Sequence, residues 1–287
     1  MTHGRVLIVL LTFRSRLDWL KEALHSVRSQ SYENWRCVIA DSTPDEQGRT
    51  AINSLMENLC RWEEFGEPRD FVYHHFPHQA TGDVAYKVNE SARIYGAGCE
   101  YIVVMSDDDY LSPFLLEKQI ATLEEDPRRG FGQGVVHTFG DTLGLWLPGD
   151  GRTDISVQDQ IGQNQYAGTC VMRMAPFLEF GGYDKDVVPE GFPCGLEDFN
   201  LFVHFLRNGY TTKVIPEVLL FARQRPEQNN RRLYGTPLYS KMVHKVCEKN
   251  GIKVVMHDPE KPGDPMRYTL EYEQHTREAC TSSQPNS

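Results

Sequence analysis

Three consecutive carboxylates, Asp107, Asp108 and Asp109, follow an apolar run at residues 101–105. A run that is apolar at every position predicts a strand buried on both faces, as in a parallel sheet. Like charges at a strand end repel each other, and a bound divalent cation would offset that repulsion. Oxygen ligands suit Mg²⁺ or Mn²⁺, which usually combine one or two carboxylates with substrate phosphates. The segment predicts a metal–phosphate site; the simpler alternative is a solvated acidic turn.

A fourth carboxylate, Asp41, ends another strand-like run at residues 36–40. In a parallel sheet it would lie on the same edge as the three aspartates, where open α/β sheets bind ligands. There it could accept hydrogen bonds from a nucleobase or a ribose, or serve only as a turn residue. Lys87 and Asn89 precede the acidic strand on a predicted helix, and they could reach a base or a phosphate or lie on a solvated face.

Two further acids, Glu197 and Asp198, stand at the start of a predicted helix over residues 197–208. The helix dipole stabilises carboxylates there, so capping alone could explain them. Alternatively, one of them is a general base that faces a cleft and removes a proton from an acceptor hydroxyl. Arg223 and Arg225 follow an apolar strand, and their guanidinium groups could neutralise a diphosphate or form an ordinary basic loop.

The elements that would position these residues alternate between strand and helix in the first half of the chain. Its predicted strands cover residues 6–11, 36–40, 71–76 and 101–105. This order predicts an α/β fold with a mostly parallel central sheet and helices on both faces. Ser112 and Pro113 resemble an N-cap and a first helical residue after the acidic segment.

The second half of the chain has a different pattern. Predicted strands at residues 135–140 and 169–173 flank a Gly- and Asp-rich excursion at residues 141–168. Thr236 and Pro237 predict the start of a last helix. Beyond Asp258 the chain is polar, and we expect its final residues to be disordered.

Composition narrows the classes of function. The 287 residues carry a net charge of -10, which argues against a nucleic-acid partner. No apolar run approaches 18 residues, so no transmembrane helix is expected. The seven cysteines are scattered and odd in number, which favours free thiols in a reducing cytoplasm. The HExxH, GxSxG and P-loop motifs are absent from the sequence, so metalloprotease, hydrolase and P-loop functions have no support.

Taken in order, several segments resemble the family 2 glycosyltransferases of the GT-A fold, over residues 5–225. Residues 6–13 are similar to that family's first strand and Thr-Tyr turn, and residues 20–32 to the helix that follows. Residues 38–42 resemble the strand whose terminal Asp contacts the nucleotide base. Residues 106–113 resemble the DxD segment with its downstream proline. Residues 181–184 and 196–198 match the Gly-Gly-Phe-Asp and Glu-Asp motifs.

The resemblance implies a GT-A domain at residues 1–225, with a nucleotide-sugar half at 1–115 and an acceptor half at 116–225. A C-terminal helix and a polar, partly disordered tail would occupy residues 226–287. The implied activity is metal-dependent, inverting transfer of a sugar from a nucleotide-diphosphate donor, with a UDP-sugar favoured. The acceptor would be a hydroxyl of a saccharide or of another molecule.

The resemblance also assigns roles to residues. Asp198 would be the catalytic base, and Glu197 would orient the acceptor or the base. Mn²⁺ or Mg²⁺ would bind Asp108 and Asp109. The nucleotide donor would contact Thr12, Phe13, Asp41, Lys87, Asn89, Asp107, Arg223 and Arg225. Trp146 and Tyr166, in the excursion, could stack on an acceptor sugar or pack within the loop.

Two departures from the family pattern leave questions open. Ser106 stands at the first DxD position, so either Asp107 and Asp109 are the operative pair or Asp108 is the chief metal ligand. Alignment to the downstream proline favours Asp108 on the metal and Asp107 near the ribose. Many relatives have a His where this chain has Arg225, which suggests diphosphate binding there instead.

Two other classes of function stay open on the sequence alone. A nucleotidyltransferase on a related α/β fold would also use an acidic metal site, but it would need a Gly-rich phosphate loop after the first strand. Residues 12–16 are basic and lack glycine. A non-catalytic GT-A-like module that binds nucleotide sugars is the other class, and retention of Asp108, Asp109 and Asp198 argues against it.

Overall fold

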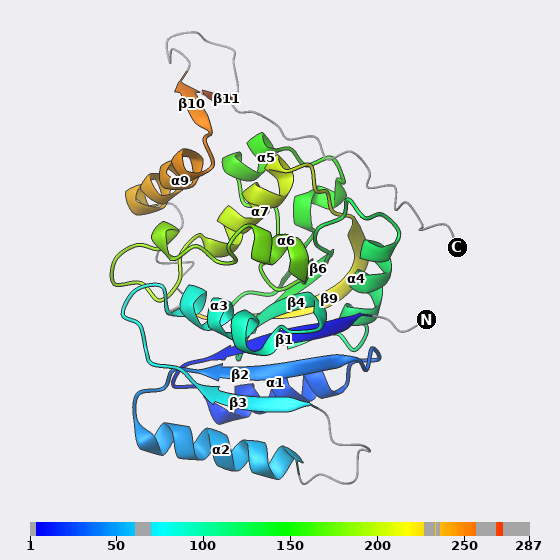
Figure 1. The fold of residues 1–287 in the computed structure, drawn as a ribbon, viewed down its shortest axis with the longest axis vertical. Helices are drawn as coiled ribbons and strands as arrows, with labels where there is room; N and C mark the ends of the chain where they lie inside the picture. The colour runs from blue at the N-terminus through cyan, green and yellow to red at the C-terminus, as the bar shows by residue number, and fades with distance from the viewer. Residues whose placement is uncertain (1–3, 61–69, 227–232, 234–235, 257–267, 272–287) are drawn as a thin grey trace, which may run out of the picture.

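A computed structural model describes residues 4–60, 70–226, 233, 236–256 and 268–271. Its centre is a five-stranded sheet with the order β3-β2-β1-β4-β8 (Figure 1). Four strands run parallel, and β8 runs antiparallel to β4. The strands are β1 (Arg5–Thr12), β2 (Trp35–Asp41), β3 (Phe71–His75), β4 (Cys99–Ser106) and β8 (Val171–Arg173). The predicted mostly parallel sheet is confirmed.

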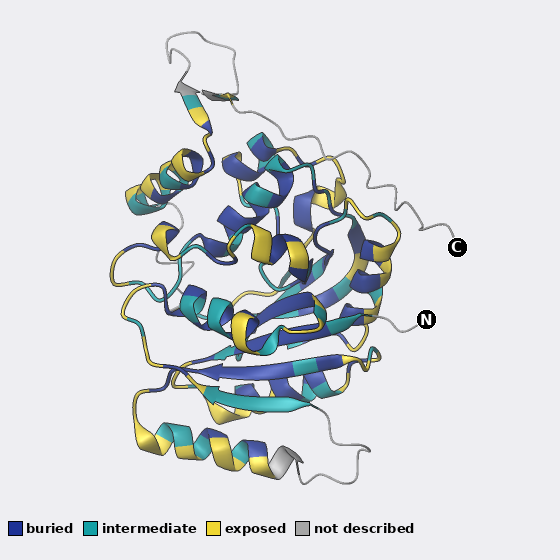
Figure 2. Ribbon diagram, viewed as in Figure 1, coloured by how far each residue is buried: buried dark blue, intermediate teal, exposed yellow. Residues whose placement is uncertain are grey.

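Helices cover both faces of this sheet, as predicted. Along β1, Val6 and Ile8 pack toward one face and Leu7 and Val9 toward the other, and all four are fully buried. Side chains alternate between the faces of a strand, so an uninterrupted apolar run supplies both cores. The first core includes side chains of α1 (Leu17–Arg28), α2 (Glu46–Cys60) and α4 (Leu115–Glu124). The second includes side chains of α3 (Asp83–Tyr95), α6 (Met174–Glu179) and α7 (Glu197–Arg207). Figure 2 shows the buried strands between these layers.

A second sheet, with the order β5-β9-β6-β7, brings residues of the two halves together. The short strand β5 directly follows the acidic segment and pairs antiparallel with β9. The strands of this second sheet are β5 (Tyr110–Leu111), β6 (Gln133–Gly140), β7 (Gly144–Trp146) and β9 (Val214–Gln224). The end of β9 therefore lies beside the acidic segment, more than 100 residues away in sequence.

The predicted cap of α4 was wrong. The helix starts at Leu115 with Phe114 as its N-cap, rather than at Pro113. Ser112 is held by the second sheet instead, because its N–H donates to the Leu219 carbonyl over 2.9 Å. Tertiary pairing has displaced the helix start by two residues.

The excursion at residues 141–168 contains more regular structure than the sequence suggested. It holds β7, a 3-10 turn at Pro148–Gly151 and the helix α5 (Val157–Gly162). Ser156 and Asp159 form a reciprocal capping box at the start of α5. A Ser followed three residues later by Asp indicates a helix start in the sequence, although the surrounding Gly-rich composition is typical of a loop.

The C-terminal part contains the predicted helix, α9 (Pro237–Lys249), and the Thr236 hydroxyl accepts the Tyr239 N–H at its start. The strands β10 (Lys253–Met256) and β11 (Tyr268–Glu271) then form an antiparallel pair. Residues 257–267 and 272–287, where disorder is expected, lie outside the described residues. Among the described helices, none is both long and apolar enough to cross a membrane.

Candidate active site

The carboxyl ends of β1, β2 and β4 meet at one edge of the central sheet. The strand register places Thr12 beside Asp41 and Leu11 beside Ser106. The Asp107 N–H donates to the Leu11 carbonyl over 3.1 Å, which anchors the acidic segment to the end of β1. The carboxylates expected on one edge therefore do lie there.

The three adjacent aspartates have different surroundings. The Asp108 carboxylate forms an ion pair with Arg225, 2.6 Å from Nη2 to Oδ2, and Asp108 is only 6% exposed. Asp109 accepts the Arg223 backbone N–H over 2.8 Å, and the Arg223 Nε donates to the Asp108 carbonyl over 3.0 Å. The end of β9 thus binds two of the three aspartates, which lie in the short segment between β4 and β5.

Burial shapes the electrostatics of this edge. It raises the pKa of Asp107, although the hydroxyl groups of Thr12 and Ser15 oppose the rise. Burial also raises the pKa of Asp109 well above its usual range, and the neighbouring Asp108 charge adds to the effect. A cation at this edge would relieve both groups by stabilising their ionised forms.

The carboxylates at this edge suit a metal ion that also binds substrate oxygens better than one held by protein side chains alone. Among the described residues, no group of three or more His, Cys, Asp or Glu side chains could hold a metal ion. One or two carboxylates do suit Mg²⁺ or Mn²⁺ when substrate phosphates supply further oxygens. Asp108 and Asp109 therefore fit an ion that binds together with a diphosphate.

A cleft of about 590 Å³ links this edge to the start of α7. Ser106 and Asp109 line it from the sheet, and Glu197 and Asp198 line it from the helix. The Asp198 carboxylate accepts the Phe199 N–H over 2.7 Å, and burial raises the pKa of Asp198. A half-buried carboxylate of raised pKa that lines a cleft is suited to accept a proton.

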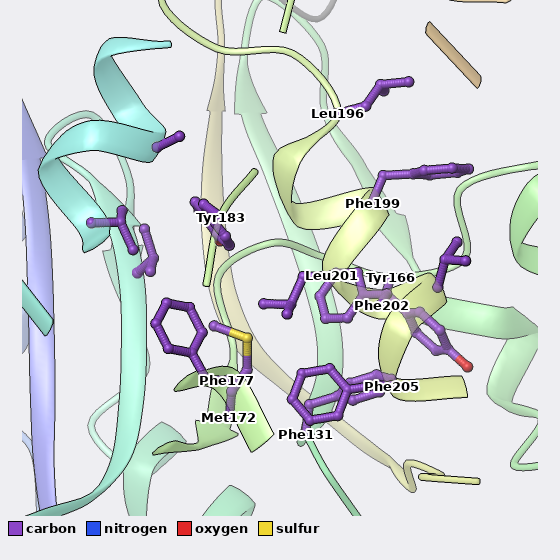
Figure 3. Close-up of a cluster of buried hydrophobic side chains, with 14 of the residues drawn as sticks. Phe131, Tyr166, Met172, Phe177, Tyr183, Leu196, Phe199, Leu201, Phe202 and Phe205 are labelled. Carbon is purple, nitrogen blue, oxygen red and sulfur yellow. The ribbon is translucent and has the colours of Figure 1, made fainter. Parts of the chain in front are cut away.

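Aromatic packing fixes the position of α7. Phe199, Phe202 and Phe205 of this helix are buried, and Figure 3 shows Phe202 and Phe205 close to Phe131 and Tyr166. The Phe131 ring centroid lies 4.8 Å from those of Phe202 and Tyr166. The helix that carries Asp198 is therefore set by a rigid core rather than by a loop.

Glu197 is 4% exposed, and its carboxylate accepts the Gly195 N–H over 2.6 Å. Burial, with the nearby Asp198 charge, raises the pKa of Glu197 to about 8. Near neutral pH the side chain is therefore mostly protonated. It can donate a hydrogen bond while Asp198 remains the acceptor of protons.

This pKa gives a testable pH dependence of stability. Between the ordinary value of 4.5 and about 8, the folded protein holds a proton that the unfolded chain has lost. The free energy of unfolding therefore falls as the pH rises through this window. Glu197→Gln removes the titration, so the Tm of the native protein should drop relative to the variant by roughly 5 °C or more. Scanning calorimetry from pH 5 to 8 checks this, and parallel curves would contradict it.

Gly168 lies against the candidate base, a contact that the sequence did not reveal. A Cβ atom at this residue would lie 2.5 Å from Oδ2 of Asp198. The absence of a side chain at residue 168 therefore leaves the space that the Asp198 carboxylate occupies.

We expect Gly168→Ala to displace the Asp198 carboxylate. A misplacement of about 1 Å can cost roughly 10²-fold in rate, and we expect a loss of that order in kcat. The control is Leu145→Ala, because that side chain is 69% exposed and is not among the residues that line the cleft. Steady-state kinetics of both variants, with circular dichroism to confirm folding, test the expectation. Equal kcat in the two variants would count against it.

Asp41 is fully buried, and protein groups occupy both of its oxygens. It accepts the Thr43 N–H over 2.9 Å and the Tyr73 hydroxyl over 2.8 Å. In this arrangement Asp41 shapes the turn after β2, and contact with a nucleobase would require Tyr73 to move. Tyr73 was absent from the predicted site, since nothing in its sequence context marks it.

Lys87 and Asn89 also act inside the protein. Lys87 is 2% exposed, and its Nζ lies 3.0 Å from the Thr12 carbonyl and 3.1 Å from Asp83. It therefore ties α3 to the end of β1. Asn89 exchanges two hydrogen bonds with the backbone of Tyr183, so it holds the Gly-Gly-Tyr-Asp segment.

Phe13 has the exposure that a nucleotide-binding residue needs. It is 41% exposed and stacks on His78, with ring centroids 4.7 Å apart. Thr12, its neighbour, is 2% exposed and contributes its carbonyl to Lys87. Phe13 therefore lies at the surface, whereas Thr12 is buried and helps to hold Lys87.

The two aromatic residues of the excursion also separate. Tyr166 is 1% exposed and packs edge-on against Phe131 and Phe202, so it belongs to the core. Trp146 is 37% exposed and lines the cleft. Both residues line the cleft, and Trp146 is by far the more exposed of the two.

Comparison with known proteins adds to this geometry. Residues 8–181, more than half of the chain, match the sequence model of glycosyl transferase family 2. The chain is 24% identical over 263 residues to EpsE of Bacillus subtilis (strain 168), a protein named as a glycosyltransferase. That alignment covers 87% of this chain and 84% of EpsE.

The fold is also similar to crystal structures of S. aureus TarS. The similarity to TarS 1–349 in complex with UDP-GlcNAc has a TM-score of 0.65 at 14% identity and covers 85% of this chain. Similarity to a longer TarS chain has a TM-score of 0.61 at 13% identity. The present chain spans 66% of the first of these and 39% of the second, less than two thirds of their lengths.

Proposed function

Because the chain belongs to glycosyl transferase family 2, we propose that it moves a sugar from a UDP-linked donor to an acceptor hydroxyl, with inversion at the anomeric carbon. One observation carries the proposal: a single cleft is lined by Asp109 at the sheet edge and by Asp198 on α7. Inverting transfer needs a base on the acceptor side and charge stabilisation on the leaving-group side. UDP is favoured because TarS, a structural neighbour, was solved with UDP-GlcNAc.

The donor would bind at the carboxyl edge of the central sheet. The exposed ring of Phe13 would stack on the uracil base, and Asp107, at the same edge of the sheet, would accept a hydrogen bond from the ribose. Arg223 and Arg225, at the end of β9, can neutralise the diphosphate. Asp41, Lys87 and Asn89 would contribute indirectly by holding β1, β2 and the Gly-Gly-Tyr-Asp segment in place.

Asp108, with Asp109, would hold Mn²⁺ or Mg²⁺ together with the diphosphate. When bound, such an ion supplies Lewis-acid stabilisation of the departing diphosphate. Asp108 is the proposed direct ligand because of its alignment to the downstream proline, and Arg225, its present partner, would have to release it.

The acceptor would bind in the part of the cleft next to α7. Asp198 takes the proton of the attacking hydroxyl as the oxygen forms its bond to the anomeric carbon and the bond to the diphosphate breaks. Glu197, mostly protonated near neutral pH, can donate a hydrogen bond that orients the acceptor. The Gly195 N–H fixes the Glu197 side chain for that role.

The direct test is a panel of nucleotide-diphosphate sugars, assayed by nucleotide release with and without EDTA. We expect release of UDP from at least one UDP-sugar, loss of that activity with EDTA, and an inverted product by NMR. Activity that survives EDTA would contradict the metal role. Release of pyrophosphate instead of a nucleoside diphosphate would indicate a nucleotidyltransferase. Failure of the whole panel to bind or turn over would contradict the proposed function.

A further inference from the structure

One wall of the cleft is built by the second sheet. Thr138 of β6, Trp146 of β7 and Gln224 at the end of β9 all line the cleft. They share one face of the sheet, because the register pairs Thr138 with Gly144 and Val136 with Trp146. Leu145, next to Trp146, is 69% exposed and projects from the opposite face.

The side chains that line the cleft are of the types that bind saccharides. An aromatic ring stands beside amide and hydroxyl groups, from Gln163, Gln224, Thr138 and Thr169. Aromatic rings pack against the C–H faces of sugar rings, and amides and hydroxyls exchange hydrogen bonds with sugar hydroxyls. The wall therefore offers both kinds of contact that a saccharide ring needs.

The ionisable side chains that line the cleft include acidic residues without basic ones. Asp109, Glu197 and Asp198 are its charged residues, and among the described lining residues none is Lys, Arg or His. Arg223 and Arg225 occupy alternate positions near the end of β9, where they pair with Glu22 and Asp108. An anionic group in the cleft would find no cationic partner among these lining residues and would be repelled by the Asp198 carboxylate.

We propose that the acceptor is an uncharged saccharide, whose ring lies on Trp146 and whose attacking hydroxyl faces Asp198. Sugars with a carboxylate or phosphate near the attacking hydroxyl are excluded by the cleft acids. This inference rests on the proposed transfer activity and specifies its acceptor class.

The test compares matched glycosides by saturation-transfer NMR in the presence of UDP and Mn²⁺. Methyl glucosides, galactosides and N-acetylglucosaminides are set against the corresponding methyl uronides and 6-phosphates. We expect at least one neutral sugar to bind about tenfold or more tightly than its anionic counterparts. Equal or tighter binding of an anionic sugar, or no binding of any neutral sugar, would overturn the proposal. The UDP signal in the same samples tests the donor site separately.

Two variants make the test specific to the wall. Trp146→Ala should weaken binding of the neutral sugar about tenfold and leave UDP affinity unchanged. Leu145→Ala, on the opposite face, should change neither. Gln224→Arg, which places a cation in the cleft, should improve binding of the uronide relative to the neutral sugar. Unchanged sugar binding in Trp146→Ala would contradict the assigned platform.

Discussion

Replacing Asp198 by Asn should reduce sugar transfer by roughly 10²–10⁴-fold, the usual contribution of a general base. Asparagine has nearly the same shape, and its side-chain oxygen can still accept the Phe199 N–H that holds Asp198. It cannot take the proton of the attacking hydroxyl. Nucleotide binding should stay nearly unchanged, because the donor edge lies on the other side of the cleft. Transfer is measured by UDP release with acceptor, and UDP affinity by calorimetry.

The pH profile provides a second readout for Asp198. Burial raises its pKa above the usual range, so the transfer rate should rise with pH as the carboxylate loses its proton. The Asn variant should lack this rise. Asp186→Asn is a matched control, since Asp186 is 57% exposed and pairs with Lys249 at the surface. Near-normal turnover in Asp198→Asn would show that Asp198 is not the general base.

The sheet and its functional edge could be predicted because they depend on local patterns. Apolar runs at residues 6–11 and 101–105 determine strands that are buried on both faces, and the carboxylates follow them directly. Alternation with helices then requires the strands to run parallel, which brings their carboxyl ends to one edge. Asp198 could be anticipated for a similar reason, since its helix start is visible in the sequence.

The finer arrangement of the site depends on contacts between distant segments, which no local pattern encodes. Arg225 meets Asp108 only because β9 pairs with β5. Gly168 lies against Asp198 through tertiary packing alone. Asp41 and Lys87 show the converse. Their residue types suggested ligand contacts, which stay predictions, but tertiary packing also buries both side chains and gives them hydrogen bonds within the protein, which the sequence did not predict.

Arg225→Gln should have opposite effects on two ligands. Without nucleotide, the Arg225 guanidinium neutralises Asp108 over 2.6 Å, so a cation must compete with it. Removing that charge should strengthen Mn²⁺ binding to the nucleotide-free protein by about tenfold, given that charged hydrogen bonds contribute ~1.5–3 kcal/mol. UDP binding in the presence of Mn²⁺ should weaken by about tenfold, because the diphosphate loses a guanidinium partner. Electron paramagnetic resonance of Mn²⁺ and calorimetry of UDP measure the two affinities.

The side chain of Arg225 has a hydrogen-bond donor to offer a phosphate. The Arg225 Nε is buried and has no hydrogen-bond partner among the described residues, so a phosphate oxygen would satisfy a donor that Asp108 leaves unused. In the native protein, Mn²⁺ and UDP should therefore strengthen each other's binding, and Asp108→Asn should abolish that coupling. Arg128→Gln removes an exposed guanidinium that pairs with Asp126 and should change neither affinity. If Arg225→Gln binds Mn²⁺ no better than the native protein, Arg225 does not compete with the cation, and Asp108 must be released in some other way.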